Sequence, residues 1–324
     1  MLTISADDVD RALDFPSLVE TLRAAFKAGA VQPVRHHHAV ERPAGAASTL
    51  LLMPAWTDFG AASVLDHGYI GVKIVTVSPD NNALGKPAVM GVYLLLDGMT
   101  GEPRALIDGQ RLTQWRTACA SALAADYLAR KDASKLLVVG AGALAPFLAQ
   151  AHAAVRPIRD IRIWNRTPAN AEKIVTQLAA EGHSATVAED LDAALGWADI
   201  VSSATITRTP LVKGALLKPG THVDLVGGFA PGMRESDDDA IRRARVYVDT
   251  RAGATREAGD IVQPLASGLV EPEAIVADLH ELARGEKSGR ETPEEITLFK
   301  SVGAALEDLA AGVAIYAAVA RKGT

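Results

Sequence analysis

The chain has 324 residues with a formal net charge of −6; 48% of its residues are hydrophobic and 22% are charged. This composition excludes a disordered chain, and the length predicts two globular domains. Lys and Arg form no run, so we expect no nucleic-acid partner. No stretch reaches the ~18 apolar residues of a membrane span, and the polar, acidic N-terminal segment lacks the pattern of a secretion signal. We therefore expect a cytoplasmic protein that is not inserted in a membrane.

The first third of the chain changes from helical to β-rich patterns. Two short helical patterns fill residues 1–30, and the second begins at Pro16, since proline suits a first helical turn. β-rich runs follow within residues 34–107, separated by clusters such as SPDNNALGKP and DGMTGEP, which predicts an antiparallel sheet. A long helix is expected from about Leu112 to Arg130. The lone cysteine, Cys119, lies in its alanine-rich part and is interpreted as a small core residue.

From residue 135 onward, short apolar runs alternate with helical stretches. The runs are KLLVVG, DIRIWN, SATVA, ADIVSSA, HVDLVGG and RVYVDT. This rhythm is typical of a parallel sheet with helices on both faces. The predicted fold class is α/β, with a Rossmann-type domain at 116–301 and an α+β domain with an antiparallel sheet at 1–115 and 302–324. The last helix, expected from about Thr297 to Ala320, would return to the first domain.

A glycine turn at residues 140–142 follows the run LLVV and precedes a helical stretch. Gly140 permits a tight turn, Gly142 lets backbone approach a pyrophosphate, and Ala145 is small enough for close helix packing. The pyrophosphate would lie at the positive end of a helix that starts near Ala143, with Ala141 and Leu144 beside it. This order of elements predicts a dinucleotide site; a glycine turn without a cofactor is the alternative.

The second strand of this unit ends in IRIWNRT, which places Asn165, Arg166 and Thr167 at the corner that faces the adenosine ribose. An NAD site usually has Asp or Glu there, whereas Arg holds a 2′-phosphate. NADPH is therefore favoured, with NADH also possible. The alternative is that Arg166 is an ordinary solvated arginine.

Three cations in or near the first domain are candidates for the substrate site. Lys73 lies in the apolar run GVKIVTV, where an ammonium is costly unless it is paired or used, and burial would lower its pKa toward the range of proton transfer. A strand lysine that points to solvent is the alternative. Arg116 lies at the start of the helical run WRTACASALAA, and its guanidinium would bind a carboxylate through two hydrogen bonds. Arg42 precedes the run STLLLMP.

The cluster RHHH at 35–38 invites a metal interpretation. Adjacent strand residues point to opposite faces, so only His36 and His38 would converge, and no third ligand stands at chelating spacing. We therefore expect no metal site. One of these histidines would line a pocket instead. Two further loops, 202–210 and 227–237, follow strands of the parallel sheet and are expected to border the nicotinamide.

Together these motifs resemble the ornithine cyclodeaminase and mu-crystallin family. The resemblance spans nearly the whole chain and rests on MPAW, GVKIV, LTQWRTACASALAA, VVGAGA, IWNRT, KPGTHVDLVGG, YVDT, REAGD and FKSVG, in this order. It implies a substrate and dimerisation domain, a Rossmann domain, a homodimer, and small imino or amino acid substrates held by Arg and Lys. It carries Lys73, Arg116 and Arg42 into substrate roles. The remaining expected cofactor contacts are Thr117, Ser203, Ala204, Thr205, Val226, Gly227 and Ser301.

One departure from the family pattern narrows the expected reaction. Cyclodeaminases and related alanine dehydrogenases carry an acid after the glycines of the 227 region, but this chain has Phe229 there. Without that carboxylate, reduction of a preformed cyclic imine is the simplest reaction, and Phe229 would form an apolar wall against the ring. The chain resembles Δ1-pyrroline-2-carboxylate and Δ1-piperideine-2-carboxylate reductases. Two alternatives remain: an NAD-dependent ornithine cyclodeaminase, and a non-catalytic NADPH-dependent ligand-binding protein.

Overall fold

The computed structural model describes residues 1–60 and 68–322, which form two compact units. Unit 1 comprises Met1–Arg116 and Ala304–Thr324, and unit 2 comprises Thr117–Gly303. The sequence placed these breaks one or two residues away, after 115 and 301. Across the described ranges, no helix is long and apolar enough to cross a membrane.

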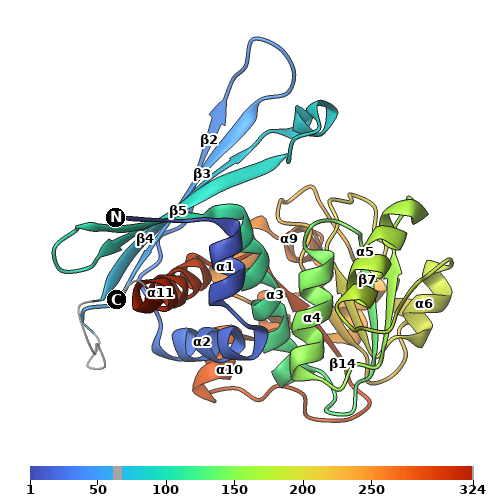
Figure 1. Cartoon of the computed structure of the whole chain (residues 1–324). Helices are drawn as coiled ribbons and strands as arrows, with labels where there is room; N and C mark the ends of the chain where they lie inside the picture. Colours follow the sequence, from blue (N-terminus) through green and yellow to red (C-terminus); the bar gives the residue numbers. More distant parts are fainter. Residues whose placement is uncertain (61–67, 323–324) are drawn as a thin grey trace. The chain divides into compact units, whose positions relative to one another are not determined.

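Unit 1 is a mixed sheet with helices (Figure 1). Its elements are β1 (Leu2–Ile4), α1 (Ala6–Ala12), α2 (Phe15–Ala28), β2 (His36–Val40), β3 (Ser48–Trp56), β4 (Tyr69–Val77), the 3-10 helix η1 (Pro79–Leu84), β5 (Val89–Asp97), β6 (Pro103–Asp108), the first residues of α3 (Gly109–Leu128) and α11 (Ala305–Lys322). The strand order is β1-β6-β5-β4-β3-β2. All neighbours pair antiparallel except β1 and β6, which are parallel. The short strand β1 was not expected, because residues 1–30 show only helical patterns.

Local signals explain the helices at the start of unit 1. Ser5 and Asp8 form a capping box at the beginning of α1. Asp14 caps α2 through the N–H of Ser17, and Pro16 occupies the first turn, as predicted. The apolar side chains of α2 lie at helical spacing, and α2 packs against α11, which also contacts β3, β4 and β5. One face of the sheet is thereby covered.

Unit 2 is the α/β part of the fold. Its elements are the rest of α3, β7 (Lys135–Val139), α4 (Ala145–Val155), β8 (Asp160–Trp164), α5 (Pro168–Ala180), β9 (Ala185–Val187), α6 (Leu191–Trp197), β10 (Ile200–Ser203), η2 (Gly214–Leu216), β11 (His222–Leu225), α7 (Asp238–Arg243), β12 (Ala244–Val248), α8 (Arg251–Glu257), α9 (Gly259–Ala266), η3 (Pro272–Ala274), β13 (Ile275–Asp278), α10 (Leu279–Arg284) and β14 (Ile296–Lys300). The strands form a parallel sheet in the order β13-β12-β14-β11-β10-β7-β8-β9.

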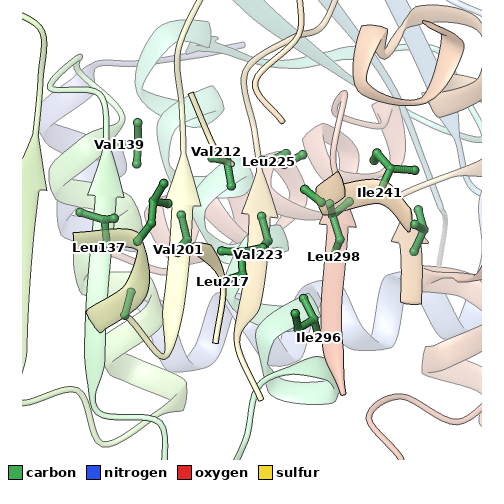
Figure 2. Close-up of a cluster of buried hydrophobic side chains, with 14 of the residues drawn as sticks. Leu137, Val139, Val201, Val212, Leu217, Val223, Leu225, Ile241, Ile296 and Leu298 are labelled. Atoms are coloured by element: carbon green, nitrogen blue, oxygen red, sulfur yellow. The ribbon is translucent and has the colours of Figure 1, made fainter. Parts of the chain in front are cut away.

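Both faces of this sheet are buried, which confirms the predicted class. Alternate strand residues enter two separate apolar clusters. One cluster includes Leu137 and Val139 of β7, with Val223 of β11 and Leu298 of β14, as Figure 2 shows. The other contains the intervening β7 residues and packs against α3, α4 and α5. Burial on two faces explains why these strands are continuous apolar runs without alternation.

The end of the chain corrects the predicted helix at 297–320. Residues Ile296–Lys300 form β14, which is fully buried between β11 and β12, and the helix begins only at Ala305. A short apolar run that is buried on both sides has no strand alternation, so its pattern cannot be distinguished from that of a helix. The strand β13 also escaped the sequence analysis. Helix α4 begins at Ala145, two residues later than expected, while Cys119 is fully buried in α3, as predicted.

Candidate active site

Three adjacent strands of unit 1 bring one row of side chains together on the buried face of the sheet. Met53 of β3 is directly opposite Lys73 of β4, and Lys73 is directly opposite Tyr93 of β5. Burial alternates along β4, and Lys73 is only 2% exposed. The alternation therefore directs this ammonium into the unit, which excludes the alternative of a lysine in solvent.

The first turn of α11 supplies two carboxylates to the cations. Lys73 Nζ lies 2.9 Å from Asp308 Oδ1 and 2.8 Å from Oδ2. Arg116 Nη1 donates to Glu307 Oε2 at 2.7 Å, and its Nε lies 2.9 Å from Asp308 Oδ1. Acidic side chains are favourable at a helix N-terminus because of the helix dipole. Two cations and two carboxylates thus form one buried network, which we call the Lys73–Asp308 network.

The ionisation of Lys73 is strongly perturbed. Burial is the main cause that lowers its pKa, to about 8, and the positive charges of Arg116 and Arg35 lower it further, while Asp308 opposes the shift by its charge and hydrogen bond. An ammonium with such a pKa can give up a proton near neutral pH. The arrangement therefore combines an anion-binding charge with a proton donor.

Arg35 joins this site, although the sequence analysis gave it no role. His36 pairs with Leu52, so one further step along the same register places Arg35 at the level of Met53, in the row of Lys73. Its charge is among those that depress the Lys73 pKa. Arg35 was noted only as a neighbour of the histidines. The signal that could have found it is its position immediately before the strand that pairs with β3.

Arg42, the third predicted cation, is not brought to Lys73. It lies in the turn between β2 and β3, where Nη2 donates to Asp80 Oδ2 at 2.7 Å and Nε donates to the Ala46 carbonyl at 2.7 Å. Ser48, at the start of β3, is about 17 Å along the strand from Met53 at 3.3 Å per residue. Arg42 lies beyond that end of the strand. Arg35, and not Arg42, is among the charges that act on Lys73.

The histidine cluster is exposed and lies on β2. His36 and His38 do converge, with ring centroids 6.2 Å apart, and they share the face of Leu52 and Leu50, not that of Lys73. His37 lies on the other face of the strand. Over the ranges 1–60 and 68–322, no three His, Cys, Asp or Glu side chains gather as metal ligands.

Tyr93 packs tightly beside the network. A Cβ on Gly71 would lie 1.7 Å from Tyr93 Oη, and one on Gly312 of α11 would lie 2.5 Å from its Cε1. Both glycines are therefore required where the tyrosine ring fills the space between β4 and α11. Burial and the charge of Asp308 raise the pKa of Tyr93 well above its usual value, so the hydroxyl stays neutral.

In unit 2, the glycine turn after β7 has the geometry expected of a phosphate-binding loop. Gly140 has a φ of 108°, and a Cβ there would meet the Ala204 carbonyl at 2.7 Å. A Cβ on Gly142 would meet nothing within 4 Å. No described residue accepts a hydrogen bond from the amides of Gly142, Ala143 or Leu144. These N–H groups precede α4 and suit an anion.

The corner after β8 is hydrogen-bonded to this turn. Asn165 Oδ1 accepts a hydrogen bond from the Ala141 amide at 3.3 Å, and Asn165 Nδ2 donates to the Thr167 carbonyl at 3.0 Å. Arg166 is exposed at the carboxyl end of β8, and no described carboxylate pairs with its guanidinium. These groups lie where the adenosine side of a dinucleotide is expected.

A buried ionic cluster supports the loops that follow β10 and β11. Glu235 Oε1 accepts hydrogen bonds from Ser203 Oγ at 2.6 Å and from the Thr205 amide at 2.8 Å. Lys300 donates to the carbonyls of Leu225 and Gly227 and lies 3.6 Å from Asp260 Oδ2. Burial raises the pKa of Glu235 to about 7; Lys300 opposes that shift, and Asp260 adds to it.

The sequence analysis quoted Asp260 and Lys300 within REAGD and FKSVG but assigned them no role, and it missed Glu235. A Cβ on Gly228 would lie 2.6 Å from Asp260 Oδ2, and one on Gly227 would lie 2.6 Å from Glu235 Oε1. The two carboxylates therefore pack directly against these two glycines. Their function here is to hold the backbone of two loops. A loop glutamate without a motif offers no signal for this in the sequence.

The other predicted residues of unit 2 lie on its loops and on α3. Ala204 and Val226 follow β10 and β11, and Phe229 is 39% exposed in the loop after β11. Thr117 is buried in α3. Ser301 follows β14, and its Oγ donates to Asp249 Oδ2 at 3.2 Å. That carboxylate oxygen also accepts the amides of the two residues after Ser301, so Asp249 determines the course of this segment.

Comparisons with known proteins agree over the full length. The ornithine cyclodeaminase/mu-crystallin family model matches residues 3–323. A Δ1-pyrroline-2-carboxylate reductase of Paracoccus denitrificans is 38% identical over 281 residues, covering 86% of this chain and 89% of the relative. A Δ1-pyrroline-2-carboxylate reductase of Thermococcus litoralis, solved with NADH and L-proline, is 33% identical with a TM-score of 0.93, covering 100% and 99%. An archaeal alanine dehydrogenase dimer with NAD is 29% identical with a TM-score of 0.90, covering 100% and 97%.

Proposed function

Because the chain belongs to the ornithine cyclodeaminase/mu-crystallin family, we propose that it reduces a cyclic ketimine carboxylate with NADPH. The substrates are Δ1-pyrroline-2-carboxylate, Δ1-piperideine-2-carboxylate or both, and the products are L-proline and L-pipecolate. The observation that carries the proposal is the Lys73–Asp308 network, which presents Lys73 and Arg116 as buried cations in one place. Such a site suits a small carboxylate with a nitrogen that needs a proton.

The enzyme class follows from the relatives. The chain is an NAD(P)H-dependent imine reductase: the similar chains include several Δ1-pyrroline-2-carboxylate reductases, and the Thermococcus litoralis enzyme was solved with NADH and L-proline. A nicotinamide cofactor also agrees with the glycine turn at Gly140. The preference for NADPH is our proposal, and it depends on Arg166.

Each residue of the proposed site has its own role in the reduction of the imine. A bound reduced nicotinamide supplies the hydride that adds to C2 of the imine. Arg116 and Arg35 hold the carboxylate, and Lys73 donates a proton to the imine nitrogen as the C=N electron pair moves onto it. Phe229 supplies an apolar wall for the ring. No carboxylate stands at residue 229 to activate water, which favours reduction over cyclodeamination.

The expected cofactor contacts fit the described geometry. The amides after Gly142 would receive the pyrophosphate, and Asn165, Arg166 and Thr167 would receive the adenosine ribose and its phosphate. Thr117, Ser203, Ala204, Thr205, Val226, Gly227 and Ser301 are proposed to line the nicotinamide side, where the Glu235 and Asp249 carboxylates hold the backbone.

A spectrophotometric assay tests the reaction directly. NADPH and NADH are each combined with the five- and six-membered imines, and the absorbance of the reduced cofactor is followed. We expect oxidation of NADPH with at least one imine. Intact cofactor binding without turnover on either imine contradicts the proposal and favours a ligand-binding protein. Release of ammonia from ornithine without net cofactor consumption indicates a cyclodeaminase instead.

Replacing Arg166 with Ala tests the cofactor preference. We expect the affinity for NADPH to fall about 10- to 100-fold while that for NADH is unchanged, because one charge-assisted contact to the 2′-phosphate is lost. The matched control is Arg159→Ala, since Arg159 is also exposed but lies at the opposite, amino end of β8. Equal NADPH affinity in both variants, measured by fluorescence titration, removes Arg166 from the site.

The outer face of the unit 1 sheet is proposed to form a homodimer interface. Most of the side chains that alternate with the buried row on β3, β4 and β5 are apolar: Leu50, Leu52, Ile70, Val72, Ile74, Met90, Val92, Leu94 and Leu96. Met90 is 43% and Val92 is 38% exposed, and large apolar patches of this kind mark interaction sites. The archaeal alanine dehydrogenase, which is a dimer, supports this proposal.

A charge on this face should separate the two copies. We expect Val92→Lys to convert the dimer to a monomer in sedimentation velocity while circular dichroism retains the secondary structure, because the lysine is tolerated in water but not within an apolar interface. A lysine in place of Phe59, which is exposed outside the strands, is the control. An unchanged dimer in the Val92 variant rejects this surface.

A further inference from the structure

The Lys73–Asp308 network contains a carboxylate that the proposed chemistry does not itself use. Asp308 is fully buried, and its two oxygens lie 2.9 and 2.8 Å from Lys73 Nζ. The same Oδ1 lies 2.9 Å from Arg116 Nε. This buried carboxylate thus contacts both the proton donor and the carboxylate-binding arginine.

We propose that Asp308 is a positioning residue for proton delivery: it keeps the Lys73 ammonium charged and aligned until the imine nitrogen takes the proton. This inference rests on the proposed function. In that step an N–H bond forms on the substrate and an Nζ–H bond of Lys73 breaks. Lys73 is left as a neutral amine, and it regains its proton from water before the next turnover.

The groups around Lys73 set the direction of each effect. Desolvation, Arg116 and Arg35 all favour the neutral amine, while Asp308 favours the ammonium. Tyr93, directly opposite on β5, stays neutral and adds no charge, and Glu307 is paired with Arg116. Asp308 is therefore the carboxylate that holds the pKa of Lys73 at about 8 instead of lower. Without it, the pKa of Lys73 would fall further below its usual value.

The neighbouring residue provides an internal comparison. Glu307 and Asp308 are adjacent in α11, both are fully buried, and both pair with Arg116, but the direct contact with Lys73 belongs to Asp308. Amide substitution removes one negative charge in either case and leaves the shape almost unchanged. The two variants therefore differ in which cation loses its partner.

The test compares pH profiles of kcat/KM for the wild type, Asp308→Asn and Glu307→Gln. Activity requires protonated Lys73, so it is lost as the pH rises through the Lys73 pKa, near 8 in the wild type. In Asp308→Asn we expect this loss about one to three pH units lower, since that is the effect of removing an opposite charge at this distance. The ratio of activity at pH 8 to that at pH 6 then falls about five- to 50-fold.

Glu307→Gln should behave differently. We expect KM for the imine to rise because Arg116 loses a partner. The alkaline limb of the pH profile, where activity is lost as the pH rises, should move by less than about half a pH unit. Ionisation of the free imine is common to all variants, so it cancels in the comparison. A direct readout follows the ¹³Cε resonance of Lys73 in labelled enzyme, assigned with Lys73→Met. It should titrate near pH 8 in the wild type and lower in Asp308→Asn.

Each outcome decides the inference. The inference about Asp308 is overturned if folded Asp308→Asn shows neither a shifted alkaline limb nor a shifted ¹³Cε titration. It is also overturned if Glu307→Gln shifts the alkaline limb as much as Asp308→Asn does. If Asp308→Asn does not fold, Asp308→Glu serves instead: the charge is kept, so the limb should stay within about half a unit while kcat falls. A limb that moves by a full unit contradicts the inference. Absence of turnover in the wild type rejects the proposed function, whereas the ¹³Cε titration still tests Asp308.

Discussion

Lys73→Met should lower kcat at least about 100-fold while NADPH binding is unchanged. General acid catalysis by a positioned side chain is typically worth ~10²- to 10⁴-fold, and methionine occupies a similar volume without a proton to give. Lys73 belongs to unit 1, whereas the glycine turn belongs to unit 2, so the substitution does not alter the residues of the turn itself. Stopped-flow kinetics measures the turnover, and fluorescence titration measures the cofactor affinity.

A surface lysine provides the control for this prediction. Lys213 is half exposed and pairs with Asp192, so Lys213→Met removes the same charge without touching the network. We expect wild-type kinetics from it. In Lys73→Met, Arg116 still contacts both carboxylates, and the melting temperature checks that the variant folds. Near-normal kcat in folded Lys73→Met would show that water or another group protonates the imine.

Gly142→Asp should abolish dinucleotide binding and leave the fold intact. The Cβ of residue 142 would project into open space at the turn, so the protein itself accommodates the side chain, but the carboxylate would occupy the place of the pyrophosphate and repel it. We expect the affinities for NADPH and NADH to fall together by at least about 100-fold, since like charges meet at a desolvated site. Calorimetry measures both the affinity and the melting temperature.

Two further substitutions separate steric from backbone effects at this turn. Gly142→Ala adds one methyl group without charge, and it should weaken binding less than Gly142→Asp. Gly140→Ala should instead lower the melting temperature, because residue 140 has a φ of 108° and its Cβ would meet the Ala204 carbonyl at 2.7 Å. Normal cofactor affinity in folded Gly142→Asp would move the pyrophosphate away from this turn.

Much of the fold was readable from local patterns. The alternation of strand and helix after residue 135, the glycine turn and the helix that begins with Pro16 are properties of neighbouring residues, and the structure agrees with them. The strand Ile296–Lys300 was missed because burial on both faces removes the alternation that identifies a strand. Its central place between β11 and β12 depends on pairing with strands about 50 and 75 residues away.

For the candidate site, too, the sequence predicted some features and the tertiary structure decided others. The sequence by itself determined that Lys73 lies in an apolar strand and that Arg116 opens an apolar helix, so both had to be paired or used. Only the tertiary structure decided their partners, because Asp308 is 235 residues from Lys73 along the chain. It likewise chose Arg35 over Arg42, since strand register, not proximity in sequence, sets which side chains share the row of Lys73. Charge, hydrophobic pattern and glycine content are local properties of a sequence, whereas the pairing of buried charges is a property of its packing.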